Sequence, residues 1–265
     1  MTHVPTRELA LHLARLLDDK GGHDVLLLAL PPSALVDFAL RRTHGIEAGM
    51  AAARAAAIAG FAGTSNVEAA RRLGIAAAGT MAHSYVQAFP TEREAFVAFA
   101  EDFPDRTTFL VDTYDTAQGI RTAVEVAGPG LGAVRLDSGD LLAQARAVRA
   151  QLDELGATGT RIIVTSDLDE HAIAALAAAP VDGYGVGTSL VTGSGAPTCG
   201  FVYKLVAVAR EDGPDAPLVP VAKTSAGKRS IGGRKWAYRT DDGREVLRLS
   251  PEGTGSPLQQ PLPSG

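Results

Sequence analysis

Residues 133–141 read AVRLDSGDL, and the interpretation of the whole chain starts from this stretch. The apolar run from Leu131 to Leu136 is typical of a short buried strand, and it ends abruptly in polar residues. The residues that follow, Asp137-Ser138-Gly139, predict a tight turn, and Asp140 is suited to cap a helix. The stretch therefore predicts a buried strand, a turn and the start of a helix.

Arg135 and Asp137 are two residues apart, so on a strand their side chains face the same side. A cation and an anion then project together from the carboxyl end of one strand, where parallel α/β folds bind their ligands. A plain ion pair at a strand end explains this stretch alone equally well. The ligand site becomes the better interpretation because other predicted strands end in the same way.

Composition limits the classes of protein and partner. The chain has 265 residues, of which 46% are hydrophobic and 21% charged, as in ordinary globular proteins. Its net charge of −5 argues against a broad nucleic-acid surface. Cys199 is the only cysteine, so no disulfide forms within the chain, and a core position in a reducing compartment is its simplest interpretation. No apolar run is long enough to span a membrane and no signal-peptide pattern is present, so we expect a cytoplasmic protein without a membrane partner.

The order of the predicted elements favours an α/β fold. Short apolar runs alternate with segments of helical spacing, as in successive βα units. The predicted strands are 35–40, 61–64, 75–78, 108–111, 131–136, 161–164 and 182–186; the predicted helices are 46–59, 66–73, 91–103 with a Thr91–Glu94 capping box, 116–126, 140–155, and one capped by Asp167 with Glu170. This pattern predicts an irregular parallel α/β barrel, complete or incomplete, and a doubly wound open sheet is the alternative.

The chain divides into four parts by composition. Residues 1–34 form an N-terminal segment with a predicted helix over 7–17, and residues 35–195 form the predicted barrel. Residues 196–250 predict a small β appendage, with strands at 200–208, 218–222, 235–239 and 246–249. Residues 251–265 are rich in Pro, Gly, Ser and Gln and predict a disordered tail.

Polar side chains follow most of the predicted strands. They are Arg41-Arg42, Thr80 with His83, Asp112, Arg135 with Asp137 and Ser138, Ser166-Asp167, and Gly187-Thr188. If the strands are parallel, all of them meet at one mouth of the barrel. Cations, carboxylates, hydroxyls and a glycine-rich turn suit a phosphorylated anion accompanied by a divalent metal.

Several of these residues also have plain structural explanations. The glycine-rich run Gly183–Thr188 suits a phosphate cradle or a tight strand exit about equally. His83 alone is more often a hydrogen-bonded structural histidine, although its place after a Gly-Thr turn favours a functional role. Lys204, Lys223 and Lys228 belong to the appendage and either close over a phosphate or lie on the solvated surface.

Longer motifs carry a family resemblance. They are Asp37–Gly45 (DFALRRTHG), Gly63–Val67 (GTSNV), Gly79–Ser84 (GTMAHS), Val134–Leu141 (VRLDSGDL), Gly185–Ser189 (GVGTS) and Val202–Val206 (VYKLV). In order and spacing, over roughly Val36 to Trp236, the chain resembles nicotinate phosphoribosyltransferases.

The resemblance implies a type II phosphoribosyltransferase fold and a homodimer. It implies that nicotinate and phosphoribosyl pyrophosphate react to give nicotinate mononucleotide and pyrophosphate, with ATP and Mg²⁺ as cofactors in NAD biosynthesis. By carry-over, His83 is the histidine that ATP phosphorylates, and Asp137 is a second catalytic, ligand-contacting residue. The remaining carried-over residues bind substrate: Thr80 and Arg135 for nicotinate, Thr188 and Arg41 for the phosphoribosyl and phosphate groups, and Ser65, Ser138 and Gly187 beside them. The metal position stays unassigned, with Asp137 and Asp112 as the nearest carboxylates.

The chain departs from the family pattern in two places. Ala39 stands where the family usually has glycine, and only about 35 residues precede the match, where relatives carry a longer portion with an aromatic that contacts nicotinate. An alternative is therefore a shortened, catalytically impaired copy that binds phosphoribosyl compounds or pairs with a full-length relative. A phosphosugar barrel enzyme such as an aldolase is a third possibility, disfavoured because no lysine ends a predicted barrel strand.

Overall fold

The structure is a computed structural model that describes residues 34–104, 107–192, 202–225, 228–251 and 255–258. The predicted helix over 7–17 and Cys199 lie outside these residues. Within them, no helix is long and apolar enough to cross a bilayer.

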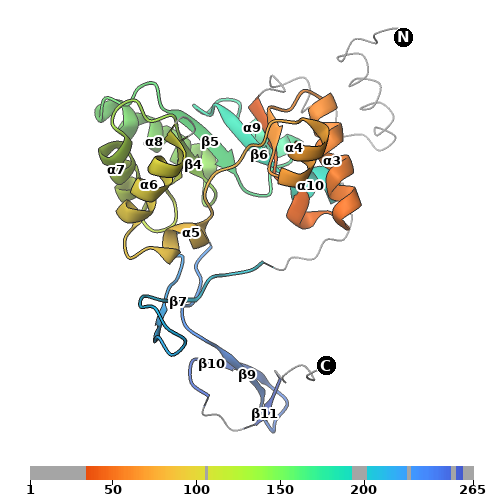
Figure 1. Ribbon diagram of the computed structural model, residues 1–265, viewed down its shortest axis with the longest axis vertical. Coiled ribbons are helices and arrows are strands. Elements are labelled where there is room, and N and C mark those ends of the chain that lie inside the picture. The colour runs from red at the N-terminus through yellow and green to blue at the C-terminus, as the bar shows by residue number, and fades with distance from the viewer. Residues whose placement is uncertain (1–33, 105–106, 193–201, 226–227, 252–254, 259–265) are drawn as a thin grey trace.

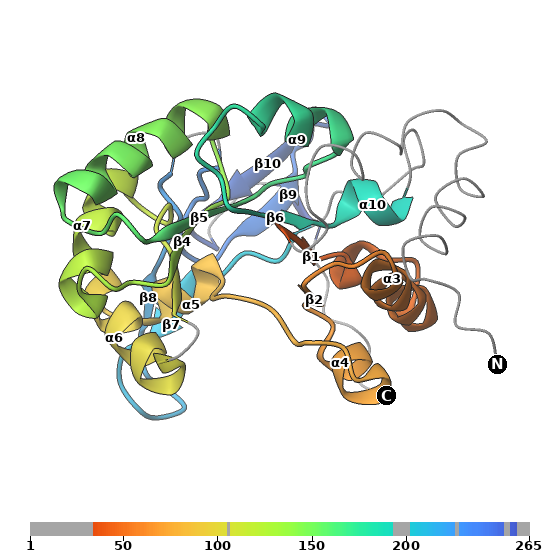
Figure 2. The same ribbon diagram turned by 90° about the horizontal axis from the view of Figure 1, so that it is seen from above.

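A curled sheet of six parallel strands forms half a barrel (Figure 1). Its strands are β1 (Leu35–Asp37), β2 (Gly63–Thr64), β3 (Thr108–Leu110), β4 (Ala133–Leu136), β5 (Arg161–Thr165) and β6 (Gly183–Val186), in the order β2-β1-β6-β5-β4-β3. Helices α7, α8 and α9 follow the outer side of β4, β5 and β6 (Figure 2). The prediction of an incomplete parallel barrel is confirmed, and the doubly wound alternative is wrong.

Six of the eight described helices fall in predicted helical segments, whereas the short α5 and α10 lie where the sequence predicted only polar strand ends. They are α3 (Ile46–Ile58), α4 (Val67–Leu73), α5 (His83–Ala88), α6 (Glu92–Asp102), α7 (Thr116–Ala127), α8 (Leu141–Glu154), α9 (Glu170–Leu176) and α10 (Thr188–Thr192). Asn66 caps α4, Asp140 caps α8 and Thr91 forms the predicted capping box with Glu94. Each cap satisfies backbone N–H groups that have no partner within the helix.

Two local predictions are wrong. Residues 75–78 do not form a strand, because only Ala77 bridges to Thr64 and alanine has a low preference for strands. Asp167 does not cap α9; Asp169 does, by accepting a hydrogen bond from the Ala172 N–H at 2.7 Å. Asp167 instead has a positive φ of 26° and accepts a hydrogen bond from Thr188.

The first strand is shorter than the predicted 35–40. Asp37 ends β1 and turns the chain, because its carboxylate accepts hydrogen bonds from the Ala39 N–H at 2.8 Å and the Thr64 hydroxyl at 2.6 Å. A 3-10 turn, η2 (Leu40–Arg42), follows. The fully buried Asp37 therefore joins β1 to β2 and delivers the arginine pair to the mouth of the half-barrel.

The core is built from aliphatic side chains and one aromatic stack. Phe96 of α6 lies parallel to Phe109 of β3, with ring centroids 4.4 Å apart, and both side chains are fully buried. Burial of such large apolar side chains is worth about 1.5–3 kcal/mol each. This packing fixes α6 and the preceding α5, which carries His83, against the sheet.

The appendage consists of short antiparallel strands on the α5 side of the half-barrel (Figure 1). β7 (Ala207–Ala209) pairs with β8 (Leu218–Pro220), and β9 (Trp236–Arg239) pairs with β10 (Glu245–Arg248) and β11 (Ser256–Pro257). Three of the predicted strands are present, whereas the one predicted over 200–208 is reduced to β7 in the described residues. β11 corrects the prediction of a disordered tail for these two residues, because they pair with β9.

Candidate active site

A large cleft of about 1430 Å³ opens on the concave side of the sheet. Eight of the nine residues predicted to form the site line it: Arg41, Ser65, Thr80, His83, Arg135, Asp137, Gly187 and Thr188. The ninth, Ser138, lies buried behind the lining and donates its hydroxyl to Asp112. The parallel strands thus bring together side chains that are up to 147 residues apart in the chain.

The cleft is strongly cationic, although the whole chain carries a charge of −5. Among the described residues that line it, seven are basic and two are acidic: Arg41, Arg42, Arg135, Arg161, Lys204, Lys223 and Lys228 against Asp137 and Asp167. A concave surface with one predominant charge raises the local concentration of ligands with the opposite charge. The cleft therefore suits an anion with several negative charges.

Arg135 uses only part of its guanidinium group for hydrogen bonds to described residues. It projects from β4 and donates a hydrogen bond to the Thr80 hydroxyl, while its buried Nε has no hydrogen-bond partner within the described residues. Burial lowers the pKa of Arg135, and the charges of Asp137 and Asp112 oppose that shift. An arginine remains charged in proteins. Its planar fork matches a carboxylate, so the free edge is suited to bind one.

His83, the first residue of α5, is bound through both ring nitrogens. Its Nδ1 lies 3.0 Å from the hydroxyl oxygen of Thr113, and its Nε2 lies 2.7 Å from the Lys223 ammonium nitrogen. Burial lowers the pKa of His83, and the nearby Lys223 charge lowers it further against the opposite effect of Asp137. The imidazole is therefore neutral at pH 7, with a lone pair available to act as a nucleophile.

Asp137 carries a stable negative charge at the end of β4. Burial alone would raise its pKa, but the contact with His83, the charge of Arg135, the hydroxyl of Thr165 and the charge of Lys228 together hold that pKa well below its usual range. Lys228 also donates to the Asp137 carbonyl oxygen at 2.5 Å. Asp137 is thus an anion at neutral pH, positioned 3.5 Å from His83 Nε2.

Asp112 organises the layer behind the cleft. It is fully buried at the end of β3, and one carboxylate oxygen accepts hydrogen bonds from the Ser138 hydroxyl and the Asp137 N–H. Lys223 lies 3.7 Å from the same oxygen and 3.4 Å from the Ser138 hydroxyl. Ser138 therefore links the ends of β3 and β4, behind the residues that line the cleft.

At the end of β6, the backbone of Gly187 packs closely against the backbone of the segment that follows β1. A Cβ added at Gly187 would lie 3.0 Å from the carbonyl oxygen of Phe38, so any larger residue would crowd this turn. Beside it, Ser166 adopts a φ of 137°, a conformation that is rare for residues other than glycine. Lys228 donates a hydrogen bond to the Ser166 hydroxyl at 3.1 Å and so holds this loop. Such a turn, next to Thr188, suits a phosphate group.

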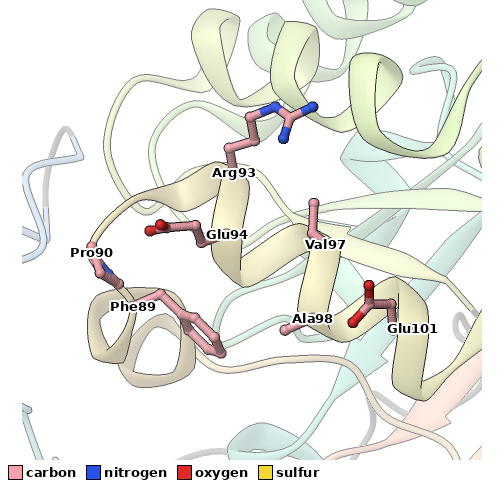
Figure 3. A pocket seen from close by; sticks show the side chains of 7 residues that line it. All are labelled: Phe89, Pro90, Arg93, Glu94, Val97, Ala98 and Glu101. Atoms are coloured by element: carbon pink, nitrogen blue, oxygen red, sulfur yellow. The ribbon is translucent and has the colours of Figure 1, made fainter.

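A second, much smaller hollow lies on α6 (Figure 3). Its volume is about 380 Å³, and Phe89, Pro90, Arg93, Glu94, Val97, Ala98 and Glu101 line it. It holds one basic and two acidic side chains and none of the predicted site residues. The cationic cleft is therefore the better candidate for the active site.

A family comparison identifies the chain. The model of the nicotinate phosphoribosyltransferase (NAPRTase) family matches residues 33–247. The chain belongs to this family. The matched range includes the half-barrel, the described lysines of the cleft and most of the appendage.

Curated NAPRTase relatives agree. The nicotinate phosphoribosyltransferase pncB1 of Mycobacterium tuberculosis is 55% identical over 213 residues, which are 77% of this chain and 46% of that protein. The Bacillus subtilis enzyme is 44% identical over 77% of this chain and 43% of its own length, and the human enzyme is 32% identical over 84% and 52%. The chain thus spans about half the length of the curated relatives it matches.

Solved structures share the fold. The NAPRTase of Porphyromonas gingivalis superimposes with a TM-score of 0.66 at 24% identity, over 86% of this chain and 62% of that one. The nicotinate-nucleotide pyrophosphorylase of Pyrococcus furiosus gives a TM-score of 0.58 at 27% identity, over 86% and 57%.

Most carboxylate oxygens near the cleft of this NAPRTase chain contact other side chains. No cluster of three His, Cys, Asp or Glu side chains with metal-binding geometry occurs among the described residues. The oxygens of Asp137 face Thr165, Lys228 and His83, and one oxygen of Asp112 is taken by Ser138. The other oxygen of Asp112 is buried and has no hydrogen-bond partner among the described residues.

The sequence left open whether Lys223 and Lys228 close over a phosphate or lie on the solvated surface. Lys223 and Lys228 come from the segment between β8 and β9 and contact His83 and Asp137, 140 and 91 residues away. Lysines in a loop are usually solvated, and no local pattern distinguishes these two. Of the three appendage lysines, only Lys204 lies within a family motif, so these contacts with His83 and Asp137 could not be predicted.

Proposed function

We propose that the protein transfers a phosphoribosyl group from phosphoribosyl pyrophosphate to nicotinate, coupled to ATP hydrolysis. The observation that carries the proposal is the pairing of Arg135 with Thr80 in a cleft with an excess of five positive charges, in a chain of the NAPRTase family. Arg135 provides a fork for the nicotinate carboxylate, and the remaining cations provide for the phosphates.

The reaction needs positioning more than it needs a base. The pyridine nitrogen of nicotinate has a free lone pair, which forms a bond to the anomeric carbon while the bond from that carbon to pyrophosphate breaks. Positive charge develops on the ribose ring and negative charge on the leaving group. Lys228, Arg41 and the turn at Gly187 are placed to stabilise the leaving group. Mg²⁺ would enter on the phosphates of the substrates and neutralise part of their charge.

The ATP step requires a nucleophile that can accept and release a phosphoryl group. His83 is suited to this role because it is neutral, lines the cleft and lies beside two carboxylates and a lysine. Asp137 stabilises the positive charge that the ring gains on phosphorylation. Incubation with ATP and Mg²⁺ should therefore place an acid-labile label on the protein, and His83→Ala should abolish it.

Substrate selectivity tests the assignment of Arg135. The unmutated protein should bind nicotinate more tightly than nicotinamide, because the amide lacks the charge that pairs with the guanidinium. Arg135→Ala should make the free energy of nicotinate binding less favourable by about 2–5 kcal/mol. The difference in affinity between nicotinate and nicotinamide should become smaller as a result. Isothermal titration of both ligands measures this. Equal affinity of the unmutated protein for the two ligands would refute the assignment.

Assembly and location belong to the same proposal. The family resemblance supports a homodimer, and the single cysteine supports a reducing, cytoplasmic environment. Light scattering of the purified chain tests the dimer: a mass near 27.4 kDa at all concentrations would exclude it.

A further inference from the structure

Lys223 is a buried lysine to which the proposed reaction assigns no role. Only 2% of its surface is exposed, and its ammonium nitrogen contacts His83, Ser138 and the Asp112 carboxylate. Burial of an ammonium group is costly unless it is paired and hydrogen-bonded. A lysine that served only to bind phosphate would be equally effective at the exposed edge of the cleft, where Lys204 lies.

The contact of Lys223 with the ring restricts where the imidazole proton can be. A charged ammonium group has only donors, so it can bind Nε2 only if that nitrogen carries its lone pair. The proton of the neutral ring then lies on Nδ1, which is 3.0 Å from the Thr113 hydroxyl oxygen, an acceptor on a fully buried residue. Burial lowers the pKa of Lys223, and the charges of Asp112, 3.7 Å from the ammonium, and of Asp137 oppose that shift and favour the charged form. The hydrogen bond to one ring nitrogen sets the tautomer of the other.

We infer that Lys223 is a positioning residue that holds His83 in the Nδ1–H tautomer and so makes Nε2 the atom that accepts the phosphoryl group. The tautomer rests on the 2.7 Å contact of Nε2 with Lys223, which is shorter than the 3.5 Å separation of Nε2 from Asp137, whereas the phosphoryl step rests on the proposed function.

The step balances without an added base. The Nε2 lone pair forms a bond to the γ-phosphorus of a nucleoside triphosphate, and the bond from that phosphorus to the bridging oxygen breaks, its electron pair leaving with the nucleoside diphosphate. Nδ1 keeps its proton, shared with Thr113. The ring becomes cationic while Nε2 faces Asp137 at 3.5 Å and Asp112 at 3.9 Å. The ammonium of Lys223 moves from Nε2 to the phosphoryl oxygens, for which it has three donors.

Nitrogen NMR of the full chain tests the tautomer. In protein labelled with ¹⁵N-histidine, the His83 signals, assigned by their loss in His83→Gln, should show a protonated Nδ1 and an unprotonated Nε2. Lys223→Met should abolish this preference, Lys223→Arg should retain it, and Lys204→Met, which changes an exposed lysine of the same cleft, should leave it unchanged. The unmutated protein decides the first point even if a variant fails to fold. A protonated Nε2 in the unmutated protein would overturn the inference. An Nδ1–H tautomer that persists in folded Lys223→Met would overturn it as well.

Phosphorylation with ATP and Mg²⁺ tests the second part of the inference, namely that Nε2 accepts the phosphoryl group. The phosphorus should be attached to Nε2, as shown by its coupling to the labelled ring nitrogen. The rate of labelling in Lys223→Met should fall by roughly two to four orders of magnitude, the range that proton positioning contributes to catalysis. Attachment to Nδ1 would overturn the inference alone. No label at all would overturn the phosphoryl-acceptor role together with the ATP-coupled part of the proposed function, while the NMR result would still assign the tautomer.

Discussion

Glu92, at the start of α6, has a buried carboxylate oxygen without a hydrogen-bond partner among the described residues. Burial, followed by the negative charges of Asp115 and Asp112, raises the pKa of Glu92 to about 7. The folded chain therefore binds a proton at Glu92 that the unfolded chain has already released between about pH 4.5 and pH 7. Because the folded state holds more protons there, this residue makes folding less favourable as the pH rises.

Glu92→Gln should remove this dependence. The variant should match the natural protein near pH 4.5 and be more stable at pH 8, by roughly 1 kcal/mol once solvent screening of a partly exposed side chain is allowed for. Urea unfolding at both pH values measures the difference. The matched control is Glu101→Gln, which changes an exposed glutamate of the same helix. It should change the free energy of unfolding by the same amount at both pH values. A gain for Glu92→Gln that is equally large at low pH would contradict the explanation.

Residues whose partners lie close in the sequence could be predicted, and the others could not. Asp140 and the Thr91–Glu94 pair cap helices through contacts within three residues, so their patterns are visible in the sequence. Arg135 lies on β4 and Asp137 directly follows that strand, and both reach the cleft. The contact of Lys223 with His83 depends on how the appendage packs, and no local rule contains that information.

At the scale of elements, Arg210 fastens the appendage to the half-barrel. It follows β7 and donates hydrogen bonds to the carbonyl oxygens of Ala88 at 2.6 Å and Gln87 at 3.3 Å, at the carboxyl end of α5. These carbonyl groups lack partners within the helix and carry its negative dipole end, so a cation there is favourable. The same α5 begins with His83, and the contact therefore ties the two ends of the helix to different parts of the appendage.

Arg210→Ala should loosen this attachment. The loss of about 0.3–1 kcal/mol, typical of a cation at a helix end, corresponds to roughly twofold to fivefold faster opening. Hydrogen exchange of peptides that cover 202–225 should accelerate by that factor. Arg244→Ala, which removes an ion pair with Asp242 within the β9–β10 turn, should leave those peptides unchanged. Equal exchange in Arg210→Ala and the natural protein would show that other contacts hold the appendage.

Element prediction succeeded where the repeating βα spacing was regular and failed where an element depended on a distant partner. The strands β3 to β6 and the helices α7 and α8 match the predicted segments within three residues at each end. Residues 75–78 had the apolar run of a strand, but their neighbour β2 is only two residues long and offers almost no edge to pair with. Strand formation depends on such pairing more than on local preference.

The whole molecule is a half-barrel with an open side. β2 and β3 form the two edges of the six-stranded sheet, and no described strand pairs with their outer sides. Residues of β1 and of the segments after β2, β4, β5 and β6 line the cleft, and no described strand closes the sheet between its two edges. Electrostatic stabilisation of a leaving group is weaker in a wet site than in a closed one. The parallel direction of the strands could be predicted from the βα repeat, whereas their number was predicted one too high, and closure of the barrel could not be predicted, since it depends on how the sheet curls.

Turnover of the 265-residue chain should therefore be slow. With nicotinate, phosphoribosyl pyrophosphate, ATP and Mg²⁺ supplied, we expect nicotinate mononucleotide to form below the ordinary enzyme range of ~1–10³ per second, while phosphoribosyl pyrophosphate still binds weakly. Chromatographic detection of the product measures the rate. A rate within that range would show that the open side is closed in solution, for instance by a second copy.

The position of Lys223 late in the chain has a consequence for synthesis. The ribosome produces the half-barrel, with Asp112 and Asp137 at its mouth, well before it reaches the lysines that neutralise them. A growing chain that folds as it emerges must therefore hold Asp112 and Asp137 without Lys223 and Lys228, and His83 without the contact at its Nε2. The surroundings of His83 are thus completed only after all six strands of the half-barrel have been made.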